Sequence, residues 1–570
     1  MVKKGDSASE AESEATDGAD LDYAARLFAG SLDDVSSLLE ALGGSARAFP
    51  GAMTELGYTE AKVWFKAMQR CFGASPPPEL EPAPGDRRFA DPAWRANPAL
   101  RAIAESYLAG SKTARHLVKS AGGPADGRGR LAFVTELLLD ALAPTNVPFL
   151  NPSVMKEALD TGGLSLLRGA GNFVDDLVRN GGQPRQVDAS PLHVGEQLAA
   201  TPGRVVMRNE LVELLAFEPQ TKRVHEVPIL ASPPWINKYY IMDLAPDRSF
   251  LEYAVQNGFT VFCLSYRDPD REMSRLGMDD YLTEGLLAGL DRVEELTGAR
   301  QTALFGLCLG GTLLGILLAY LAAHGEADRI AWAAMTNTLI DFAEPGQLGV
   351  FTGESSIAAL EEVMKKKGFL PASMMRGTFD WLRSTDLVWN SVIANWYQGK
   401  QPAVFDILAW NADSTNLPAR MHSQYLRSCY LENRLVEPGA FEILSTPIDM
   451  SKVTTPLYVL GAEADHIAPW RSTYRTTQLV SGEATYTLTS SGHIAGIVNP
   501  PGNPKARYWT RPDCPADPDD WRDGAVLHEG SWWENWLSWA SQRSGKLVAP
   551  PELPPGAKAP GRYVVSRRDD

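Results

Sequence analysis

The chain has 570 residues, a formal net charge of −16 at pH 7 and 44% hydrophobic residues. This length exceeds one ordinary domain and predicts two domains, or one large domain with insertions. The negative charge argues against nonspecific nucleic-acid binding, although an anionic substrate could still bind in a local basic pocket.

The first part of the chain predicts a helical region behind an acidic tail. Residues 1–22 are acidic and contain no aromatic side chain, so we expect them to be disordered. Apolar residues then follow at helical spacing, as in "DYAARLFAGSLDDVSSLLEALGG" and "GRLAFVTELLLDALAP", with a Pro-rich connector between them. We therefore predict an α-helical N-terminal domain over residues 23–195.

From residue 196 onward, strand-like and helical segments alternate. "FTVFCLSY", "QTALFG" and "IAWAAMTNTLI" have the composition of buried strands, and amphipathic or apolar helical segments separate them. This alternation is typical of the α/β class, with a parallel sheet and crossover helices. We predict a catalytic domain over residues 196–570.

The alternation stops between about residues 341 and 445 and then resumes with "TTPLYVLGAEADHIAPW". The interrupting segment is rich in Trp, Met, Asn and Pro. An insertion of this length usually has its own structure, and many such insertions form lids. We predict a cap or lid subdomain over residues 341–445.

Further features bear on where the protein works. The longest apolar run, Leu313–Ala323, is shorter than the roughly 20 residues that a membrane-spanning helix needs. The N-terminus lacks the apolar segment of a secretory signal. Five cysteines without a CxxC pair argue against a disulfide framework or a structural zinc site. We expect a cytoplasmic protein with no membrane span and no metal site.

Residues 306–310 read "GLCLG", which is the spacing of a nucleophile elbow with cysteine in place of serine. In an elbow the nucleophile, here Cys308, lies on a tight strand-to-helix turn. A glycine two positions to either side lets the strand and the helix pack closely. The dipole and the free N–H groups of the following helix favour a thiolate. The alternative is a Gly-rich turn around a buried, inert cysteine.

An elbow requires an acid and then a histidine after later strands. Asp465, after "LYVLG", and His493, after "TYTLTS", stand in that order. We predict that His493 takes the thiol proton of Cys308, and that Asp465 holds the histidine tautomer or acts on a second proton. His466 and Glu463 are the rivals. We interpret His466 as structural, and Asp465 rather than Glu463 as the acid.

The same chemistry requires two N–H donors for an oxyanion hole. One donor should be Leu309, the residue after the nucleophile. The other should come from the loop after the strand-like "VPIL", where Ile236 or Trp235 is the candidate. The alternative is that this stretch of proline and aromatic residues only packs.

Trp532, Trp536 and Trp539 lie at i, i+4 and i+7 in "SWWENWLSWA". This spacing predicts a helix stripe that faces the core. The alternative is a surface that contacts a polymer or a granule.

Taken together, these residues resemble the poly(3-hydroxyalkanoate) synthase family over roughly residues 200–545. The resemblance rests on "SPPWINKYYIMDL", "SYRDP", "GLCLGGT", "WNADSTNLP", "GAEADHIAPW", "SGHIAGIVNPP" and "GSWWENW". It implies an α/β-hydrolase core whose catalytic residues fall on Cys308, Asp465 and His493. Asp243 in "YYIMDL" also matches a motif position, as a candidate for the active-site shell. The N-terminal region matches only in length and helical character.

The resemblance implies a single-polypeptide synthase, closer in its motifs to the short-chain subtype. The implied substrate is an (R)-3-hydroxyacyl-CoA such as 3-hydroxybutyryl-CoA, and the products are a polyester and free CoA. No cofactor is implied beyond the CoA thioester of the substrate. The family further implies a homodimer through the cap, which includes Trp410, and a cytoplasmic location on polymer granules with granule-associated proteins.

Polymer synthesis gives a chemical reason for a cysteine nucleophile. Transfer of an acyl group from CoA to Cys308 exchanges one thioester for another and is nearly isoenergetic, and the product stays reactive toward a hydroxyl. Water must then be kept out, because it would hydrolyse the acyl-enzyme. The competing hypotheses are a thioesterase or another cysteine hydrolase on the same scaffold, and a noncatalytic granule-coating protein.

Overall fold

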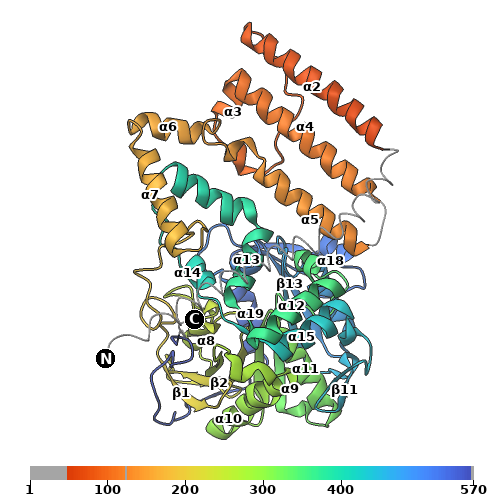
Figure 1. Cartoon of the computed structure of the whole chain (residues 1–570). Helices are drawn as coiled ribbons and strands as arrows, with labels where there is room; N and C mark the ends of the chain where they lie inside the picture. Colours follow the sequence, from red (N-terminus) through yellow and green to blue (C-terminus); the bar gives the residue numbers. More distant parts are fainter. Residues whose placement is uncertain (1–47, 122–124, 567–570) are drawn as a thin grey trace. The chain divides into compact units, whose positions relative to one another are not determined.

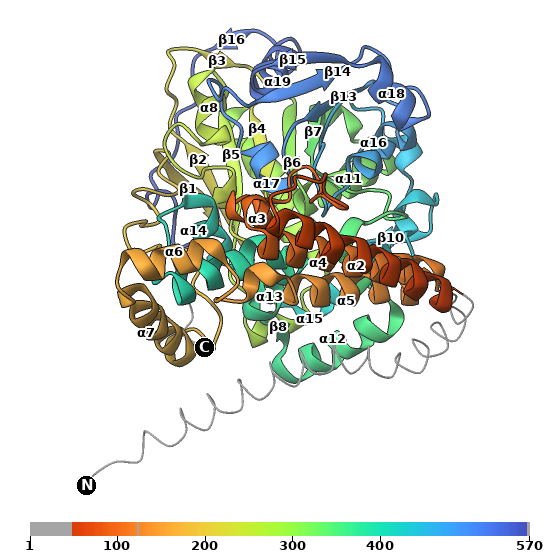
Figure 2. The ribbon, with the colours of Figure 1, turned by 90° about the horizontal axis from the view of Figure 1, so that it is seen from above.

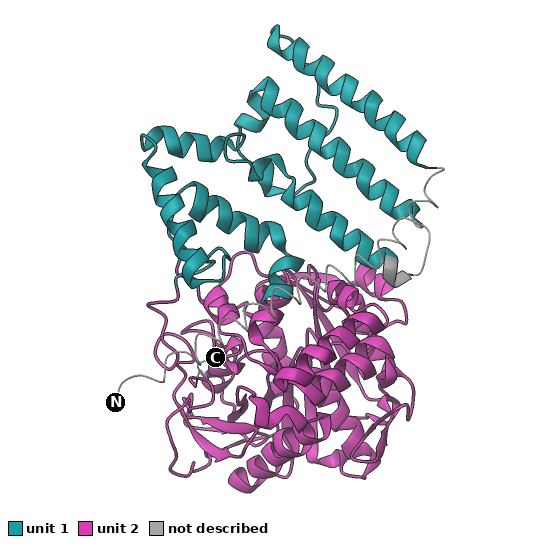
Figure 3. Ribbon diagram, viewed as in Figure 1, with its two compact units in different colours: residues 1–188, 377–403 teal, residues 189–376, 404–570 magenta. Residues whose placement is uncertain are grey.

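The computed structural model describes residues 48–121 and 125–566 and separates the chain into two compact units (Figure 3). Unit 1 takes its described residues from 1–188 and 377–403, and unit 2 from 189–376 and 404–570. The predicted disordered tail, residues 1–22, lies outside the described residues. The segment 377–403 falls within the predicted cap of the catalytic domain, yet it belongs to unit 1.

Unit 1 is helical, and its three long helices α2, α4 and α5 lie side by side (Figure 1). The helices are α2 (Phe49–Cys71), η2 (Arg87–Phe89), α3 (Ala93–Ala96), α4 (Pro98–Ser120), α5 (Ala125–Ala141), η3 (Pro144–Asn146), α6 (Pro152–Asp160), α7 (Leu164–Arg179), η9 (Ser384–Trp389) and η10 (Val392–Tyr397). The side chains of Asn97 and Asn151 cap α4 and α6, and each is followed by a proline at the first helical position. The predicted helical character of the N-terminal region is confirmed.

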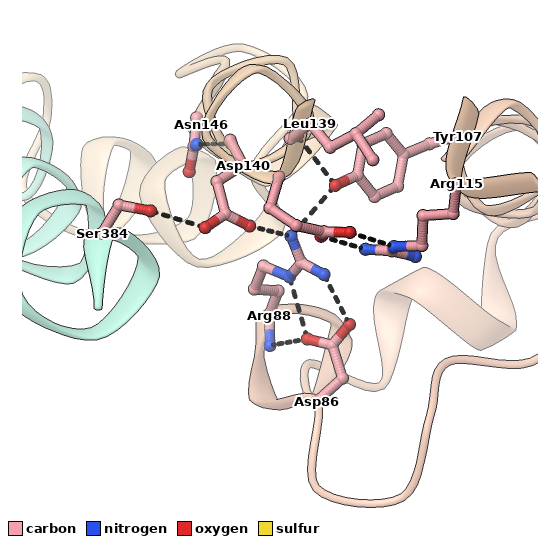
Figure 4. Close-up of polar contacts among 9 residues, drawn as sticks. Asp86, Arg88, Tyr107, Arg115, Leu139, Asp140, Asn146 and Ser384 are labelled. Atoms are coloured by element: carbon pink, nitrogen blue, oxygen red, sulfur yellow. Dashed lines mark hydrogen bonds and ion pairs between the residues drawn. The ribbon is translucent and has the colours of Figure 1, made fainter. Parts of the chain in front are cut away.

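A line of polar contacts links the segment 377–403 to the earlier helices of unit 1 (Figure 4). The guanidinium of Arg88 lies between the carboxylates of Asp86 and Asp140, at N–O distances of 2.9 and 3.1 Å. The second oxygen of Asp140 accepts a hydrogen bond of 2.5 Å from the hydroxyl of Ser384. Asp140 therefore joins α5 to the start of η9.

The second attachment of this segment is the contact between α7 and η10. The indole N–H of Trp396 donates to a carboxylate oxygen of Asp176 at 2.8 Å. A Cβ on Gly169 would lie 2.0 Å from the carbonyl oxygen of Trp396, so the two backbones meet where no side chain would fit. The ring of Phe173 packs edge-on against the same indole, with 5.0 Å between ring centroids. Through these contacts, residues far along the chain pack against α7 within unit 1.

Unit 2 is built on a ten-stranded sheet in the order β1-β2-β5-β4-β6-β7-β12-β13-β14-β15, whose central strands can be followed in Figure 2. The six strands from β5 to β13 are mutually parallel, and the pairs at either side of them are antiparallel. The strands are β1 (Gly203–Arg208), β2 (Val212–Phe217), β4 (Ile229–Ser232), β5 (Val261–Tyr266), β6 (Thr302–Leu307), β7 (Ile330–Thr336), β12 (Leu457–Ala462), β13 (Ala484–Thr489), β14 (Arg507–Thr510) and β15 (Val526–Glu529). The predicted α/β class is confirmed.

The helices of unit 2 outside the insertion connect and cover these strands. They are η4 (Tyr239–Ile241), α8 (Phe250–Gln256), η5 (Arg271–Arg275), α9 (Met278–Asp280), η6 (Tyr281–Leu287), α10 (Ala288–Thr297), α11 (Leu309–Ala323), η7 (Ala327–Arg329), α16 (Trp470–Leu479), α17 (His493–Ile497), α18 (Pro518–Gly524) and α19 (Trp532–Ser541), beside the short strands β3 (Val224–His225) and β16 (Leu547–Val548). Helix α11 is apolar around its whole circumference, which is typical of a buried helix, and most of its residues are buried. Within residues 48–121 and 125–566, no helix combines the length and apolar character needed to cross a membrane.

The tryptophans of α19 form part of the core of unit 2. Trp532 and Trp536 are fully buried against Phe250, with ring centroids 5.4 and 4.7 Å away. Trp539 packs edge-on against Trp332 of β7, at 5.6 Å. The predicted core-facing stripe is confirmed.

The insertion lies between β7 and β12, which pair directly with each other in parallel. The sheet therefore resumes on the neighbouring strand, and the insertion does not change the strand order. Its elements in chain order are η8 (Gly346–Phe351), α12 (Glu354–Lys367), β8 (Phe369–Leu370), α13 (Ala372–Leu382), η9, η10, α14 (Asp406–Ala412), β9 (Leu417–Pro418), α15 (Ala419–Tyr425), η11 (Leu426–Leu431), η12 (Arg434–Val436), β10 (Phe441–Ile443), β11 (Thr446–Ile448) and η13 (Met450–Lys452).

Candidate active site

Cys308 lies on the turn between β6 and α11, with φ 51° and ψ −120°. A positive φ is strained for a residue with a side chain, and the surrounding structure must hold it in place. Two contacts with the end of β7 do so. The N–H of Cys308 donates to the carbonyl of Thr336 at 2.9 Å, and its carbonyl accepts from the hydroxyl of Thr338 at 3.1 Å. The side chain is partly exposed, so a substrate can reach the sulfur.

The two flanking glycines are required by close backbone contacts. A Cβ on Gly306 would lie 2.5 Å from the Cα of Gly311, which would separate β6 from the first turn of α11. A Cβ on Gly310 would lie 2.0 Å from the carbonyl oxygen of Ser232, at the end of β4. Both glycines therefore allow the close packing that an elbow needs.

His493 and Asp465 meet at the carboxyl ends of neighbouring strands. The Nδ1 atom of His493, the first residue of α17, lies 2.6 Å from Oδ2 of Asp465, in the loop after β12. The other carboxylate oxygen of Asp465 accepts the N–H groups of Ile467 and Ala468 at 2.8 and 2.9 Å. The carbonyl of His493 accepts the side-chain amide of Asn337 at 2.6 Å. Asp465 is thus held by backbone N–H groups, and the backbone of His493 is held by a side chain that follows β7.

The imidazole of His493 also lies close enough to Cys308 for the two side chains to interact, so the structure brings the three predicted residues together. Burial lowers the pKa of His493, but the interactions with Asp465 and Cys308 together raise it by more, and the net pKa lies well above 6.5. The arrangement places beside Cys308 a base that can take its proton, which is how a cysteine nucleophile is activated.

The rival residues lie elsewhere. Glu463 is about half exposed and forms an ion pair of 3.1 Å with Arg522. His466 is partly exposed, and its carbonyl accepts the N–H of Gln347 at 2.9 Å. The structure therefore places Asp465, and not Glu463, against the imidazole of His493.

The two oxyanion candidates come from different elements. Leu309 is the first residue of α11, where a backbone N–H has no acceptor within the helix. In the loop after β4, Trp235 is buried and packs edge-on against Tyr425, with 5.5 Å between ring centroids. Ile236 is partly exposed. The side chain of Trp235 therefore packs in the core, whereas the oxyanion donor would be a backbone N–H of this loop, for which Ile236 remains the predicted residue.

Tyr425 and Tyr430 of the insertion lie near the nucleophile, and no pattern in the sequence indicated them. Their rings pack edge to face, with ring centroids 5.5 Å apart. Burial raises the pKa of both phenols, and the neighbouring Cys308 raises it further. Residues five apart diverge on an α-helix, which turns about 100° per residue. The π-helix η11 (Leu426–Leu431) has wider turns and brings the two rings together.

Comparison with known proteins shows the family of the chain. Residues 85–254 match the family model described as poly-beta-hydroxybutyrate polymerase (PhaC) N-terminus, and residues 235–500 match the alpha/beta hydrolase fold. The poly(3-hydroxyalkanoate) polymerase of Methylorubrum extorquens is 40% identical over 90% of this chain and 86% of its own length. The chain belongs to the poly(3-hydroxyalkanoate) polymerase family.

Other polymerases of this family show the same extent of similarity. Poly(3-hydroxyalkanoate) polymerase 2 of Ectopseudomonas oleovorans is 41% identical over 86% of this chain and 88% of its own length. The polymerase subunit PhaC of Cupriavidus necator is 38% identical over 85% of this chain and 83% of its own. The N-terminal family model also covers residues 85–195, so the sequence-based limit of the resemblance at about residue 200 was too narrow.

Asp243, the remaining motif position, is fully buried at the start of the loop after η4. The hydroxyl of Thr201 donates to its carboxylate, and the hydroxyl of Ser249 also interacts with it. These contacts do not include Cys308, Asp465 or His493. Burial raises the pKa of Asp243 to about 7, although its hydrogen bonds act in the opposite direction.

The raised pKa of Asp243 predicts a pH-dependent stability. An exposed aspartate in the unfolded chain has a pKa near 4, so between pH 4 and 7 only the folded state holds the proton. The stability that this group contributes is full below pH 4 and is lost as the pH rises through about 7. Asp243→Asn stays neutral and keeps the oxygen that accepts from Thr201. We expect the unfolding free energy of this variant, relative to wild type, to be about 2–4 kcal/mol larger at pH 8 than at pH 4.

Chemical denaturation at the two pH values measures this difference. Asp247→Asn is the matched control, because Asp247 lies on the surface four residues further along the chain. Its relative stability should not change with pH. A constant stability difference for Asp243→Asn would show that the buried carboxyl does not titrate in this range.

Proposed function

We propose that the protein polymerises (R)-3-hydroxyacyl groups from their CoA thioesters through a covalent thioester on Cys308. The observation that carries this proposal is the cysteine on a strained elbow, beside the His493–Asp465 pair, in a chain of the polymerase family. The enzyme is an acyltransferase of that family.

The first half-reaction loads the enzyme. His493 takes the thiol proton of Cys308, and the thiolate attacks the thioester carbonyl of the substrate. The N–H groups of Leu309 and Ile236 are the proposed donors to the oxyanion that forms. When this intermediate collapses, the bond between the acyl carbon and the CoA sulfur breaks. The CoA thiolate leaves with the proton from His493, and the acyl group stays on Cys308.

The second half-reaction makes the ester bond. Asp465 holds Nδ1 of His493, which leaves Nε2 to take the proton from the 3-hydroxyl group of an incoming substrate. The alkoxide attacks the acyl-enzyme carbonyl, an ester forms, and Cys308 leaves as a thiolate that recovers its proton from His493. The lengthened chain is then on the incoming CoA thioester, from which Cys308 can take it again.

The surroundings of Cys308 favour transfer over hydrolysis. Phe342 packs against Tyr425 and Tyr430, with ring centroids 6.0 and 4.9 Å apart, and Trp235 closes the same aromatic group. These rings place apolar surface beside an acyl-enzyme that water would otherwise hydrolyse. The same feature supports the insertion as a lid.

The finer properties rest on the resemblance of the motifs to the short-chain type. We take 3-hydroxybutyryl-CoA as the substrate, no cofactor beyond its CoA group, and a cytoplasmic location on polymer granules with granule-associated proteins. A homodimer through the cap belongs to the same proposal. The indole of Trp410 is 5% exposed and donates to the carbonyl of Lys238 at 2.8 Å, so this ring packs within its own chain. A dimer would therefore use other cap residues.

Two substrates separate a polymerase from a thioesterase. With 3-hydroxybutyryl-CoA, the full chain should release CoA and form polyester over many turnovers. Butyryl-CoA lacks the hydroxyl that continues the chain, so it should load Cys308 and release about one equivalent of CoA. Continuous CoA release from butyryl-CoA, or free 3-hydroxybutyrate without polymer, would identify a hydrolase instead.

A further inference from the structure

Lys238 is a buried cation at the end of the loop that carries Ile236. Its side chain is 5% exposed, and its ammonium group lies 2.9 Å from Oδ1 of Asp413 in the insertion. The same ammonium donates to the carbonyl of Val564, near the C-terminus, at 2.7 Å. A charged side chain is rarely buried unless its partners are fixed, and here they come from two distant parts of the chain.

The partners of Lys238 are held in turn. The second carboxylate oxygen of Asp413 accepts the hydroxyl of Tyr240 at 2.9 Å. The carbonyl of Lys238 accepts the indole N–H of Trp410. On the C-terminal side, the N–H of Tyr563, next to Val564, donates to the buried carboxylate of Glu213 at 3.0 Å. Both the side chain and the backbone of Lys238 are therefore tied to fixed groups.

The loop of residues 233–238 lies between the elbow and the insertion. On one side, the first turn of α11 approaches it so closely that a Cβ on Gly310 would lie 2.6 Å from the carbonyl oxygen of Pro233. On the other side, Asn237 and Ser414 form an isolated antiparallel bridge. Ile236 lies between these two attachments, three residues after Pro233 and two before Lys238.

We propose that Lys238 and Asp413 are positioning residues, which fix the loop so that the N–H of Ile236 points at the oxyanion formed on the Cys308 thioester. The inference rests on the proposed function, because it assigns a purpose to the second oxyanion donor. A buried ion pair adds little net stability, since the cost of removing both charges from water offsets their attraction. It does fix geometry, and a displacement of about 1 Å at a reacting group can lower a rate about 100-fold.

Lys238→Met distinguishes positioning of the oxyanion donor from activation of the Cys308 thiol. Alkylation of Cys308 by iodoacetamide needs the thiolate but no oxyanion hole, and this rate should stay within about threefold of wild type. Loading by butyryl-CoA needs both. The first-turnover release of CoA should fall about 100- to 1,000-fold, as expected when an oxyanion donor is misplaced. The split between the two rates is the signature of a positioning role.

Arg248→Met is the matched control. Arg248 forms an ion pair with Asp406, and this pair also joins the insertion to the segment after η4 without touching the loop of residues 233–238. Both rates should stay within about twofold of wild type in this variant. Tyr240→Phe is the milder test if Lys238→Met does not fold. It removes one hydrogen bond to Asp413 and should slow loading about 3- to 10-fold without changing alkylation.

Three results would overturn the proposal. These are unchanged loading in Lys238→Met, an equal loss of loading and alkylation, or, where Lys238→Met does not fold, no effect of Tyr240→Phe on loading. The proposed function fails differently. In that case the wild-type protein itself would release no first-turnover CoA, or would release it without an adduct on Cys308.

Discussion

Cys308→Ala is expected to lower CoA release from 3-hydroxybutyryl-CoA by at least about 10⁴-fold, because the acyl group loses its covalent acceptor. Mass spectrometry of wild-type protein treated with butyryl-CoA should show one butyryl group on the peptide that contains Cys308. The alanine variant should show none. Full CoA release by Cys308→Ala would contradict both the nucleophile and the mechanism.

Cys308→Ser tests why the nucleophile is a cysteine. A serine ester is more stable than a thioester and is a poorer donor to the next hydroxyl. This variant should therefore load slowly and then hold the acyl group, with about one equivalent of CoA released and no polymer. The control is Cys71→Ser, which removes an exposed thiol of unit 1 and should leave polymer synthesis unchanged. Polymer formation by Cys308→Ser at the wild-type rate would remove the chemical reason for cysteine.

The second large effect is expected from His493→Gln. Loss of the general base should lower acyl transfer about 10²- to 10⁴-fold. The raised pKa of His493 keeps the imidazole protonated beside the sulfur at neutral pH, so the wild-type protein should react with iodoacetamide even near pH 6. In the variant, the alkylation rate near pH 6 should fall well below that of the wild type, because the sulfur has lost the imidazole that takes its proton.

His466→Gln is the matched control for His493→Gln. It removes an imidazole from the loop next to Asp465 and should change the transfer rate by no more than about twofold. An equal loss of transfer rate in both histidine variants would show that the assignment of His493 as the base is wrong. An alkylation rate of His493→Gln that follows the wild-type pH profile would show that His493 does not activate Cys308.

The elbow and the strand ends could be predicted because their signals are local. A strand, a turn with glycines at fixed offsets and an apolar helix follow one another within about 20 residues around Cys308. The carboxyl ends of parallel strands meet at one edge of a sheet, so residues after β6, β12 and β13 converge there whatever lies between them. This is why the order of Cys308, Asp465 and His493 was enough to find them.

The other site features depend on packing that no local pattern records. Tyr425 and Tyr430 are brought together by a π-helix, and their spacing in the sequence fits no regular face of an α-helix. Asp243 lies in a motif, but the motif does not say which way its side chain points. The structure directs it to Thr201 and Ser249. Similarly, the sequence shows Lys238 only as a lysine in a loop, because its partners Asp413 and Val564 lie far away along the chain.

The division of the insertion between the two units could not be predicted from the sequence either. Periodicity shows that a helix has an apolar or polar face, but it does not show against which partner the face packs. The hydrogen bonds of Ser384 to Asp140 and of Trp396 to Asp176 join residues more than 200 positions apart. The predicted boundaries of the cap followed the interruption of the strand pattern. Residues of both units lie within that interruption, so the pattern does not separate them.

Residues 377–403 belong to unit 1, and this limits how far the two units can be exchanged independently of each other. The chain passes between the units at 188/189, at 376/377 and again at 403/404, so a single cut does not separate them. A chimaera that exchanged only the first 188 residues between two family members would present Trp396 and Ser384 to foreign helices. Evolution of the helical unit and of the cap is therefore coupled, because residues on both sides of these contacts must change together.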